Sequence, residues 1–350
     1  MRFSQPVPMG FPFRKRIFAL GILFYFFFQI PILAQFQGYD EANGSPYLAA
    51  LFSKGTAVSD PMGSLYGNVA FINRNRQNYL DFGTSGSYAS QTSGAALLSA
   101  GSYFQMGETW GFGFRGKPVY QRAFPIDSKF NNYAIQGFLS KSITNQLSLG
   151  IAIGPGISGR PGGYSSYSWN VSTHVSYHLQ NFKFGLVLES PGSYRYDKYL
   201  GSEKLVERLP ERVMVGLAYE VNETLQFYVE GIRTFWERAY FDLNKNNEIP
   251  RYPVDTMYTY NIGTSYGNRK HLQVLGGFGT EGKPTSERGI KQLYGGSIGV
   301  AGGFFPETLG PGYFYAVSLQ RVGFGVSEEE GAESRFGFQL QSQFGNLPAK

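Results

Sequence analysis

The feature that most constrains this chain is a two-residue alternation of apolar side chains with polar or small ones. It recurs between residues 78 and 344 in fourteen segments, most of them separated by links rich in polar residues and glycine. In one segment Trp169 and Val171 share one face, whereas His174 belongs to the other. Because successive side chains of a β-strand point to opposite sides, each segment predicts a strand with one apolar and one polar face.

The length and number of these segments favour a membrane barrel. Most reach the ~9–11 residues that a tilted strand needs to cross a bilayer, and single-chain bacterial barrels have even strand numbers. The predicted strands are 78–90, 94–106, 109–118, 131–143, 145–154, 166–179, 181–190, 211–221, 223–236, 256–266, 269–280, 291–304, 312–324 and 334–344. The expected fold class is all-β, a transmembrane antiparallel β-barrel of about 14 strands.

The links between the strands carry a second signal. Very short links near Gly107, Thr144, Gln180, Asn222 and Gly267 alternate with mostly longer ones. The longer links are 119–130, 155–165, 191–210, 237–255 and 281–290. Short periplasmic turns that alternate with longer outer loops are typical of outer-membrane barrels.

A soluble β-sandwich or propeller is the alternative fold. Its polar face would meet water and should be rich in charge. Here the polar faces carry mostly Ser, Gly, Asn and Gln, and charged residues make up 16% of the chain, against about 25% in soluble domains. This composition favours a barrel lumen. A sheet in lipid must also close, because every backbone polar group there needs a partner.

Residues 1–34 have the pattern of an export signal. Arg14–Arg16 precede an apolar run from Ile17 to Leu33, and Ala34 offers a small residue for cleavage. A membrane anchor is the alternative, but the run is short of the ~20 residues that a spanning helix needs. We therefore expect a cleaved signal peptide and an integral protein of the bacterial outer membrane. The mature chain keeps 27 basic and 25 acidic residues, a balance that predicts no nucleic-acid partner.

Between the signal and the first strand lie residues 35–77, which do not alternate cleanly. Their apolar content argues against disorder. A segment at this position has three destinations, namely the barrel lumen, the periplasm or a disordered leader, and we favour the lumen. The expected organisation is a signal peptide at 1–34, an N-terminal hatch or plug at 35–77, a barrel at 78–344 and a tail at 345–350.

The residues of this segment give the chain a specific resemblance. The small-residue stretch Ala50–Asp60 is followed by Asn68-Val69-Ala70. Farther on, Leu209-Pro210 leads into the strand that ends at Gly216-Leu-Ala-Tyr219. These motifs resemble those of the outer-membrane long-chain fatty acid and hydrocarbon transporters of the FadL/TodX type. That family has Asn-Pro-Ala where this chain has Asn68, Val69 and Ala70, so the proline is replaced by valine.

The resemblance implies a fourteen-stranded barrel with a hatch, which passes fatty acids or hydrocarbons by capture, binding and passive release. In this family release can be lateral, through a gap made by a kinked strand, and Gly116 and Pro118 mark a candidate kink. Arg115 and Lys117 on the polar face are candidates to hold a carboxylate head group. The candidate ligand-lining apolar residues are Leu48, Leu51, Phe52, Leu65 and Phe71. The expected partners are a hydrophobic small molecule or fatty acid, outer-membrane lipid and the barrel-assembly machinery.

Two other functions stay open from the sequence. A general porin for small solutes would have the same strands but an unplugged lumen. A non-transport barrel, acting as an adhesin or as a partner of secretion machinery, would favour long, charged outer loops, and the loops here are moderate in length.

We predict neither an enzyme nor a cofactor. The fingerprint Gly111-x-Gly113-x-x-Gly116 lies in a predicted strand, and Gly263-x-Ser265-x-Gly267 runs from a strand into a short turn. Neither has the helix that a dinucleotide site or a nucleophile elbow needs. We also predict no metal site. One weak calcium-loop candidate has oxygen ligands at Asp242, Asn244 and Asn246, but it lacks the glycine and the acidic residue that close such loops.

Overall fold

The computed structural model describes most of the chain beyond the predicted signal. The described residues are 39–41, 45–75, 77–89, 92–93, 97–123, 129–160, 164–199, 203–243, 256–284, 290–304, 312–326 and 332–346. The predicted signal peptide, 1–34, lies outside them, as do Asn244 and Asn246 of the candidate calcium loop.

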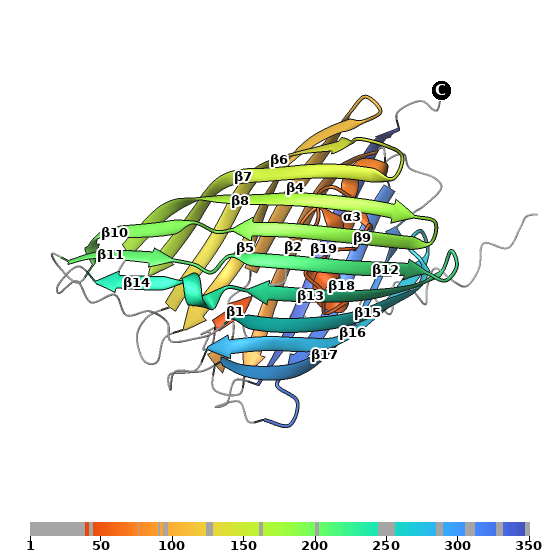
Figure 1. Cartoon of the computed structure of the whole chain (residues 1–350). Coiled ribbons are helices and arrows are strands. Elements are labelled where there is room, and N and C mark those ends of the chain that lie inside the picture. Colours follow the sequence, from red (N-terminus) through yellow and green to blue (C-terminus); the bar gives the residue numbers. More distant parts are fainter. Residues whose placement is uncertain are drawn as a thin grey trace, which may run out of the picture. The chain divides into compact units, whose positions relative to one another are not determined.

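Fourteen antiparallel strands of the described residues form one closed barrel (Figure 1). They are β2 (Gln77–Ala89), β4 (Leu97–Met106), β5 (Trp110–Ala123), β6 (Lys129–Ser142), β7 (Leu147–Arg160), β8 (Tyr164–Leu179), β9 (Phe182–Ser190), β12 (Arg212–Glu220), β13 (Leu225–Thr234), β15 (Met257–Asn268), β16 (Leu272–Pro284), β17 (Ile290–Phe304), β18 (Gly312–Val322) and β19 (Glu333–Asn346). Each pairs with its neighbours in chain order, and β19 closes the barrel on β2. The predicted fold class and strand number are confirmed.

Five shorter strands lie outside this set. β1 (Tyr39–Glu41) pairs with β5, and β3 (Thr92–Ser93) pairs with β2. A separate three-stranded sheet consists of β10 (Ser193–Tyr199), β11 (Glu203–Arg208) and β14 (Tyr240–Leu243), in the order β10-β11-β14. These last three strands occupy stretches that the sequence predicts as loops, because none of them reaches the length that a spanning strand needs.

Helical structure in the described residues is limited to short turns of chain. These are α2 (Pro46–Ala50), α3 (Pro61–Ser64) and two 3-10 helices, η1 (Ile72–Asn75) and η2 (Trp236–Arg238). None of the described helices is long and apolar enough to cross a membrane.

The two faces of the strands differ as the alternation predicts. On β8, Trp169 is 67% exposed on the outer surface, whereas His174, five residues later, is 1% exposed and faces inward. The outer surface carries large apolar side chains such as Leu149 and Ile298, which are also exposed. An apolar outer band around a polar interior is the arrangement that a barrel presents to lipid.

The two ends of the barrel also differ. At one end the first residue of β2, Gln77, pairs with the last residue of β19, Asn346, and the strands are joined by short turns. Asn222 stabilises one of these turns, since its Oδ1 accepts hydrogen bonds from the backbone N–H groups of Thr224 and Leu225. The other end carries the longer connections and the sheet β10-β11-β14, which extends beyond the barrel strands in Figure 1.

Candidate functional site

Residues 45–75 lie inside the barrel and form its filled interior, here called the plug (Figure 1). Nearly every described side chain of the plug is buried, and its apolar residues make up most of the main hydrophobic core. Partners of the plug come from strands far apart in the sheet, including β5, β13 and β19. The plug is therefore held by the lumen-facing side chains of the wall.

Local sequence sets the shape of the plug. Ser45 caps α2 by accepting a hydrogen bond from the N–H of Leu48, and Asp60 caps α3 in the same way from Met62. Each cap is followed by a proline at the first helical position, where the missing N–H costs nothing. Two short helices with defined starts give the plug a fixed chain path.

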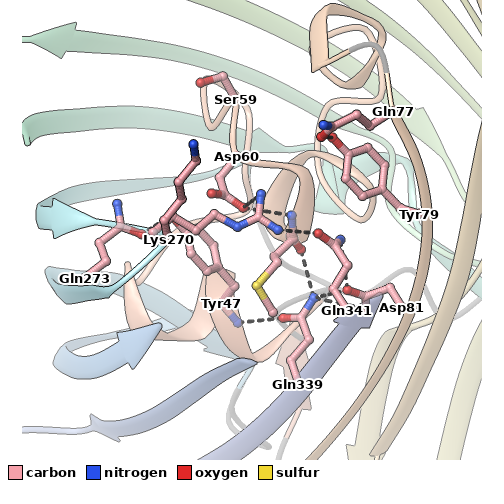
Figure 2. Close-up of polar contacts among 12 residues, drawn as sticks. Tyr47, Ser59, Asp60, Gln77, Tyr79, Asp81, Lys270, Gln273, Gln339 and Gln341 are labelled. Atoms are coloured by element: carbon pink, nitrogen blue, oxygen red, sulfur yellow. Dashed lines mark hydrogen bonds and ion pairs between the residues drawn. The ribbon is translucent and has the colours of Figure 1, made fainter. Parts of the chain in front are cut away.

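One polar network joins the plug to β2 and β19 (Figure 2). Gln339 accepts a hydrogen bond from the backbone N–H of Tyr47 and donates to the Asp81 carboxylate, at 3.0 and 2.9 Å from its two oxygens. The Tyr66 hydroxyl donates to the same carboxylate at 2.7 Å. Burial, and then the nearby charge of Asp81, hold the pKa of Tyr66 well above its usual value of 10.0, so the hydroxyl remains a donor.

A second contact joins the plug loop 53–56 to Glu230 on β13. The carboxylate accepts five hydrogen bonds, from the Lys54 N–H at 2.7 Å, the Thr56 N–H at 2.8 Å, Asn261 Nδ2 at 3.2 Å, Ser53 Oγ at 3.3 Å and the Thr56 hydroxyl. Gly55, with φ of +84°, lets the loop turn so that N–H groups on either side of it point to one carboxylate. Glu230 is 3% exposed, so these donors replace its hydration.

A third contact joins the turn 65–67 to β5, with the opposite polarity. Arg115 donates through Nη1 to the carbonyls of Leu65, Tyr66 and Gly67, at 3.1 to 3.3 Å. Lys117 donates to the Tyr66 carbonyl at 3.2 Å. The two candidate head-group residues therefore contact plug carbonyls in this structure.

Lys117 and Arg212 share one carboxylate. Lys117 Nζ lies 3.1 Å from Glu189, and Arg212 pairs with the other oxygen of the same carboxylate. Together with Arg115, these residues bring three buried cations and one buried anion into the lumen. A guanidinium binds a carboxylate more strongly than it binds a carbonyl. The cluster therefore favours binding of a further anion if the plug carbonyls move away from it.

Asn68 connects the two loops of the plug. Its Nδ2 group donates to the carbonyls of Thr56 and of Val175 on β8, both at 2.9 Å, and its Oδ1 accepts from the N–H of Ala70 at 3.1 Å. Val69 and Ala70 are buried beside it. The polar member of the motif thus bonds the backbone of both the plug and the wall.

The five apolar residues that the sequence suggests as ligand-lining are packed within the plug and against the barrel wall, where Phe52 contacts Leu293 and Val322. Their exposed fractions are 0% for Leu48, Leu51, Leu65 and Phe71, and 2% for Phe52. In this state they contact protein on all sides, so a ligand reaches them only if the plug moves.

The barrel wall has a seam between β4 and β5. Their pairing runs from Met106↔Trp110 to Ala100↔Gly116 and stops there, although β5 continues to Ala123. Pro118 follows in β5, and the pairing of β5 with β6 shifts register between Pro118 and Tyr120. Because proline cannot donate a ladder hydrogen bond, β5 leaves the β4 edge at this point. Farther along, β1 pairs with residues 120–122 of β5.

No protein-family model matches this chain, and no curated protein matches its sequence. Many solved structures are similar in fold, and three of them illustrate the likeness. A FadL homologue of Pseudomonas aeruginosa gives a TM-score of 0.66 at 13% identity, over 88% of this chain and 99% of that one. The CymD monoaromatic hydrocarbon channel gives 0.66 at 10% identity, over 87% and 98%. The Pseudomonas putida toluene transporter TodX gives 0.59 at 12% identity, over 88% and 99%.

The chain has the fold of the FadL and TodX structures. The resemblance that the sequence motifs suggest is thus confirmed at the level of the fold. The likeness extends over nearly the whole of each neighbour's chain, so the barrel is matched as a unit.

The sequence fingerprints of enzymes lie in barrel strands. Gly111, Gly113 and Gly116 belong to β5, whereas Gly263 and Gly267 belong to β15. Neither set adjoins a helix. Among the described residues, no group of three or more His, Asp or Glu side chains has the arrangement of a metal site.

Sequence reasoning did not single out Glu230, Asp81 or Gln339, which bind the plug. Each occupies a lumen-facing position in an alternating strand, where polar residues are expected in any barrel. Glu230 and Asp81 differ from their neighbours only in charge, since acidic residues are uncommon on these faces, and Gln339 has no distinguishing signal. The network therefore became visible only when the plug and the wall were brought together.

Proposed function

We propose that this protein is an outer-membrane channel for hydrophobic compounds, fatty acid-like or hydrocarbon, which captures its ligand in a plugged barrel and releases it passively. The supporting observation is the packed lumen. An open porin passes polar solutes through water, whereas here residues 45–75 fill the interior with buried side chains. A hydrophobic solute gains nothing from a water-filled path, and a filled barrel keeps small solutes from leaking.

The outer surface supports membrane insertion. Apolar side chains such as Phe227, Val229 and Ile262 form an exposed band around the strands, and all backbone groups in lipid must be paired in a closed sheet. By the usual pattern of short periplasmic turns, the end that bears Gln77 and Asn346 faces the periplasm. We propose export through cleavage after Ala34 and insertion by the barrel-assembly machinery.

The seam between β4 and β5 supports a lateral exit. The cations Arg115 and Lys117 lie on β5 where it parts from β4, and both bind plug carbonyls. Movement of the plug would expose these cations together with its apolar residues. We propose that an acidic ligand then places its carboxylate on Arg115 and Lys117 and its chain against the plug residues Leu48, Leu51, Phe52, Leu65 and Phe71.

The test compares the intact protein with a variant that lacks residues 45–72. In planar bilayers the intact protein should show little conductance, and the deletion should raise it by at least tenfold. Proteoliposomes with the intact protein should take up oleate or toluene faster than protein-free liposomes do, and the uptake rate should saturate with ligand concentration. The deletion should abolish this saturation.

A matched pair of substitutions controls for damage to the barrel. Gly277→Ala places a Cβ 2.2 Å from the carbonyl oxygen of Leu51, whereas Gly276→Ala on the opposite face meets nothing nearer than 3.8 Å. Only the first should raise conductance. An intact protein that conducts like an open porin, or a deletion without effect, would refute the proposal.

A further inference from the structure

The outer surface carries one compact group of arginines and aromatic rings that the channel function does not use. Arg233 is the exposed residue next to the end of β13, and its guanidinium lies 4.5 Å from the ring centre of Phe235 and 5.7 Å from that of Tyr258. Arg238 also lies 4.5 Å from the Phe235 ring. The two guanidinium carbons are therefore separated by at most twice that distance.

The backbone that carries the group is held in place. Trp236, between the two cations in sequence, is 1% exposed and anchors η2 in the protein. The N–H of Phe235 donates to the Glu211 carbonyl at 3.0 Å, and that of Arg238 donates to the Phe235 carbonyl at 3.1 Å. These contacts fix the backbone positions from which Phe235 and Arg238 extend.

The arginines of the group, Arg208, Arg233 and Arg238, outnumber its carboxylates, Glu211 and the exposed Glu237 beside Arg238. The Glu211 carboxylate pairs with Arg208 at 2.7 Å and with Arg238 at 3.0 Å. Burial alone would raise the pKa of Glu211, but these two arginines outweigh it and hold that pKa below its usual value, so the carboxylate stays charged. Within the described residues, Arg233 contacts only the two aromatic rings and no carboxylate.

The position of Arg233 matches the outer boundary of the apolar band. On the same outward row of β13 lie Phe227 and Val229, both exposed. Arg233 follows the first residue of β13 by eight positions, about 26 Å along a strand, or roughly 20 Å along the barrel axis at the usual tilt. The apolar band of such barrels is ~25 Å tall, and an arginine on the lipid face costs ~2–4 kcal/mol at its centre but little at its edge.

When a guanidinium stacks on an aromatic ring, its plane lies against the ring. The N–H groups at its edge then remain available to bind a planar or tetrahedral anion. Arg233, and the N–H groups of Arg238 that Glu211 does not occupy, lie beside the exposed Tyr258 at the height of lipid head groups, and this arrangement matches a phosphorylated lipid. We propose that Arg233 and Arg238, with Phe235 and Tyr258, bind a phosphate group of the glycolipid in the outer leaflet. This inference goes beyond the transport function and rests only on the proposed orientation, with the long-loop end outward.

The test measures lipid binding to the purified protein in detergent by native mass spectrometry. The probes are bisphosphorylated lipid A, its dephosphorylated form, and phosphatidylglycerol with matched acyl chains. The intact protein should bind bisphosphorylated lipid A at least about tenfold more tightly than the other two. The double variant Arg233→Gln/Arg238→Gln should lose about tenfold in this affinity, and Arg233→Lys/Arg238→Lys should lose less, about threefold, because it keeps the charge but not the planar guanidinium that stacks on the ring.

The matched control is Lys141→Gln. Lys141 lies 4.4 Å over the Trp110 ring on the outer surface at the short-turn end, so it offers the same kind of contact at the opposite boundary. It should leave lipid A affinity unchanged. Heat-modifiable gel migration should show that every variant is folded, and channel conductance should stay at the level of the intact protein, which separates this inference from the transport function.

Three results would overturn the proposal. These are equal affinity of the double glutamine variant and the intact protein, an equal loss with Lys141→Gln, and binding of dephosphorylated lipid A or phosphatidylglycerol as tight as that of bisphosphorylated lipid A. The last result would mean that acyl chains or any anionic lipid suffice.

Discussion

Two of the contacts between the plug and the barrel wall are made by loops of opposite backbone polarity. The loop 53–56 turns its N–H groups to the wall and meets the carboxylate of Glu230. The turn 65–67 directs its carbonyls to the wall and meets the cations Arg115 and Lys117. In each place the charged partner comes from the wall and the neutral dipoles come from the plug.

The difference between the two contacts suggests which one holds the plug and which one can release it. In both contacts the charged wall group bonds backbone N–H or carbonyl groups of the plug, and these bonds need no opposite charge on the loop. The 65–67 contact adjoins the seam and involves a cluster with more cations than anions. The 53–56 contact involves a carboxylate with five donors. We therefore expect the first to be the releasable contact and the second to be the anchor.

The largest effect should come from Glu230→Gln. The amide keeps one acceptor oxygen but directs an NH₂ group at N–H donors of the loop, so several charge-assisted hydrogen bonds are lost. We expect the seating of the plug to weaken by about 3–4 kcal/mol. Hydrogen exchange in the 53–56 region should rise by a hundredfold or more.

The control for that variant is Glu281→Gln. Glu281 is also a buried wall carboxylate, but it pairs with Arg335. If it accelerates exchange in the plug as much as Glu230→Gln does, the effect comes from loss of lumen charge in general and the anchor assignment is wrong.

Arg115→Gln should have the next largest effect, about 2 kcal/mol, because three neutral carbonyls lose their donor. Exchange should rise at residues 65–67 and stay near its original rate at 53–56. Equal opening of both loops would show that the plug moves as one rigid body, and the comparison between anchor and releasable contact would then fail.

Gly277→Ala should cost about 1–3 kcal/mol by overpacking against the Leu51 carbonyl. It acts on the backbone of the plug without changing any charge. Conductance of this variant should exceed that of Gly276→Ala, and an equal conductance of the two would mean that the plug adjusts without leaving its place.

The smallest effect should come from Tyr66→Phe, which removes the 2.7 Å hydrogen bond to Asp81 and leaves the ring. The expected loss is about 1 kcal/mol, since Gln339 and Gln341 still donate to that carboxylate. Exchange at 65–67 should rise about fivefold. A change larger than that of Arg115→Gln would reverse the assigned order of the contacts.

Much of the barrel was predictable from the sequence. All fourteen strands overlap their predicted ranges, with most ends within four residues, and the alternation gave the correct face for Trp169 and His174. The end of β5 was harder to predict from the sequence, because Pro118 suggests that the strand ends there. The strand instead continues to Ala123 with a shift in register, which only its pairing with β6 reveals.

The site was predictable only in part. Asn68 was singled out by its motif and Arg115 by its place on the polar face of a strand, and both bind plug or wall backbone in the structure. The sequence analysis gave no role to Gly277. In the structure a side chain there would meet the plug backbone.

Period-two alternation is a local property, set by the pleat of a single strand, and it therefore determined the class of fold and the direction of each side chain. The contacts that hold the plug are not local. Thr56 and Glu230 are 174 positions apart in the chain, and Tyr47 and Gln339 are 292 apart. Closure of the sheet brings these residues together, and no pattern within either segment predicts which residues will meet. The tertiary structure alone decided which polar side chains of the lumen face the plug, and with which backbone groups they pair.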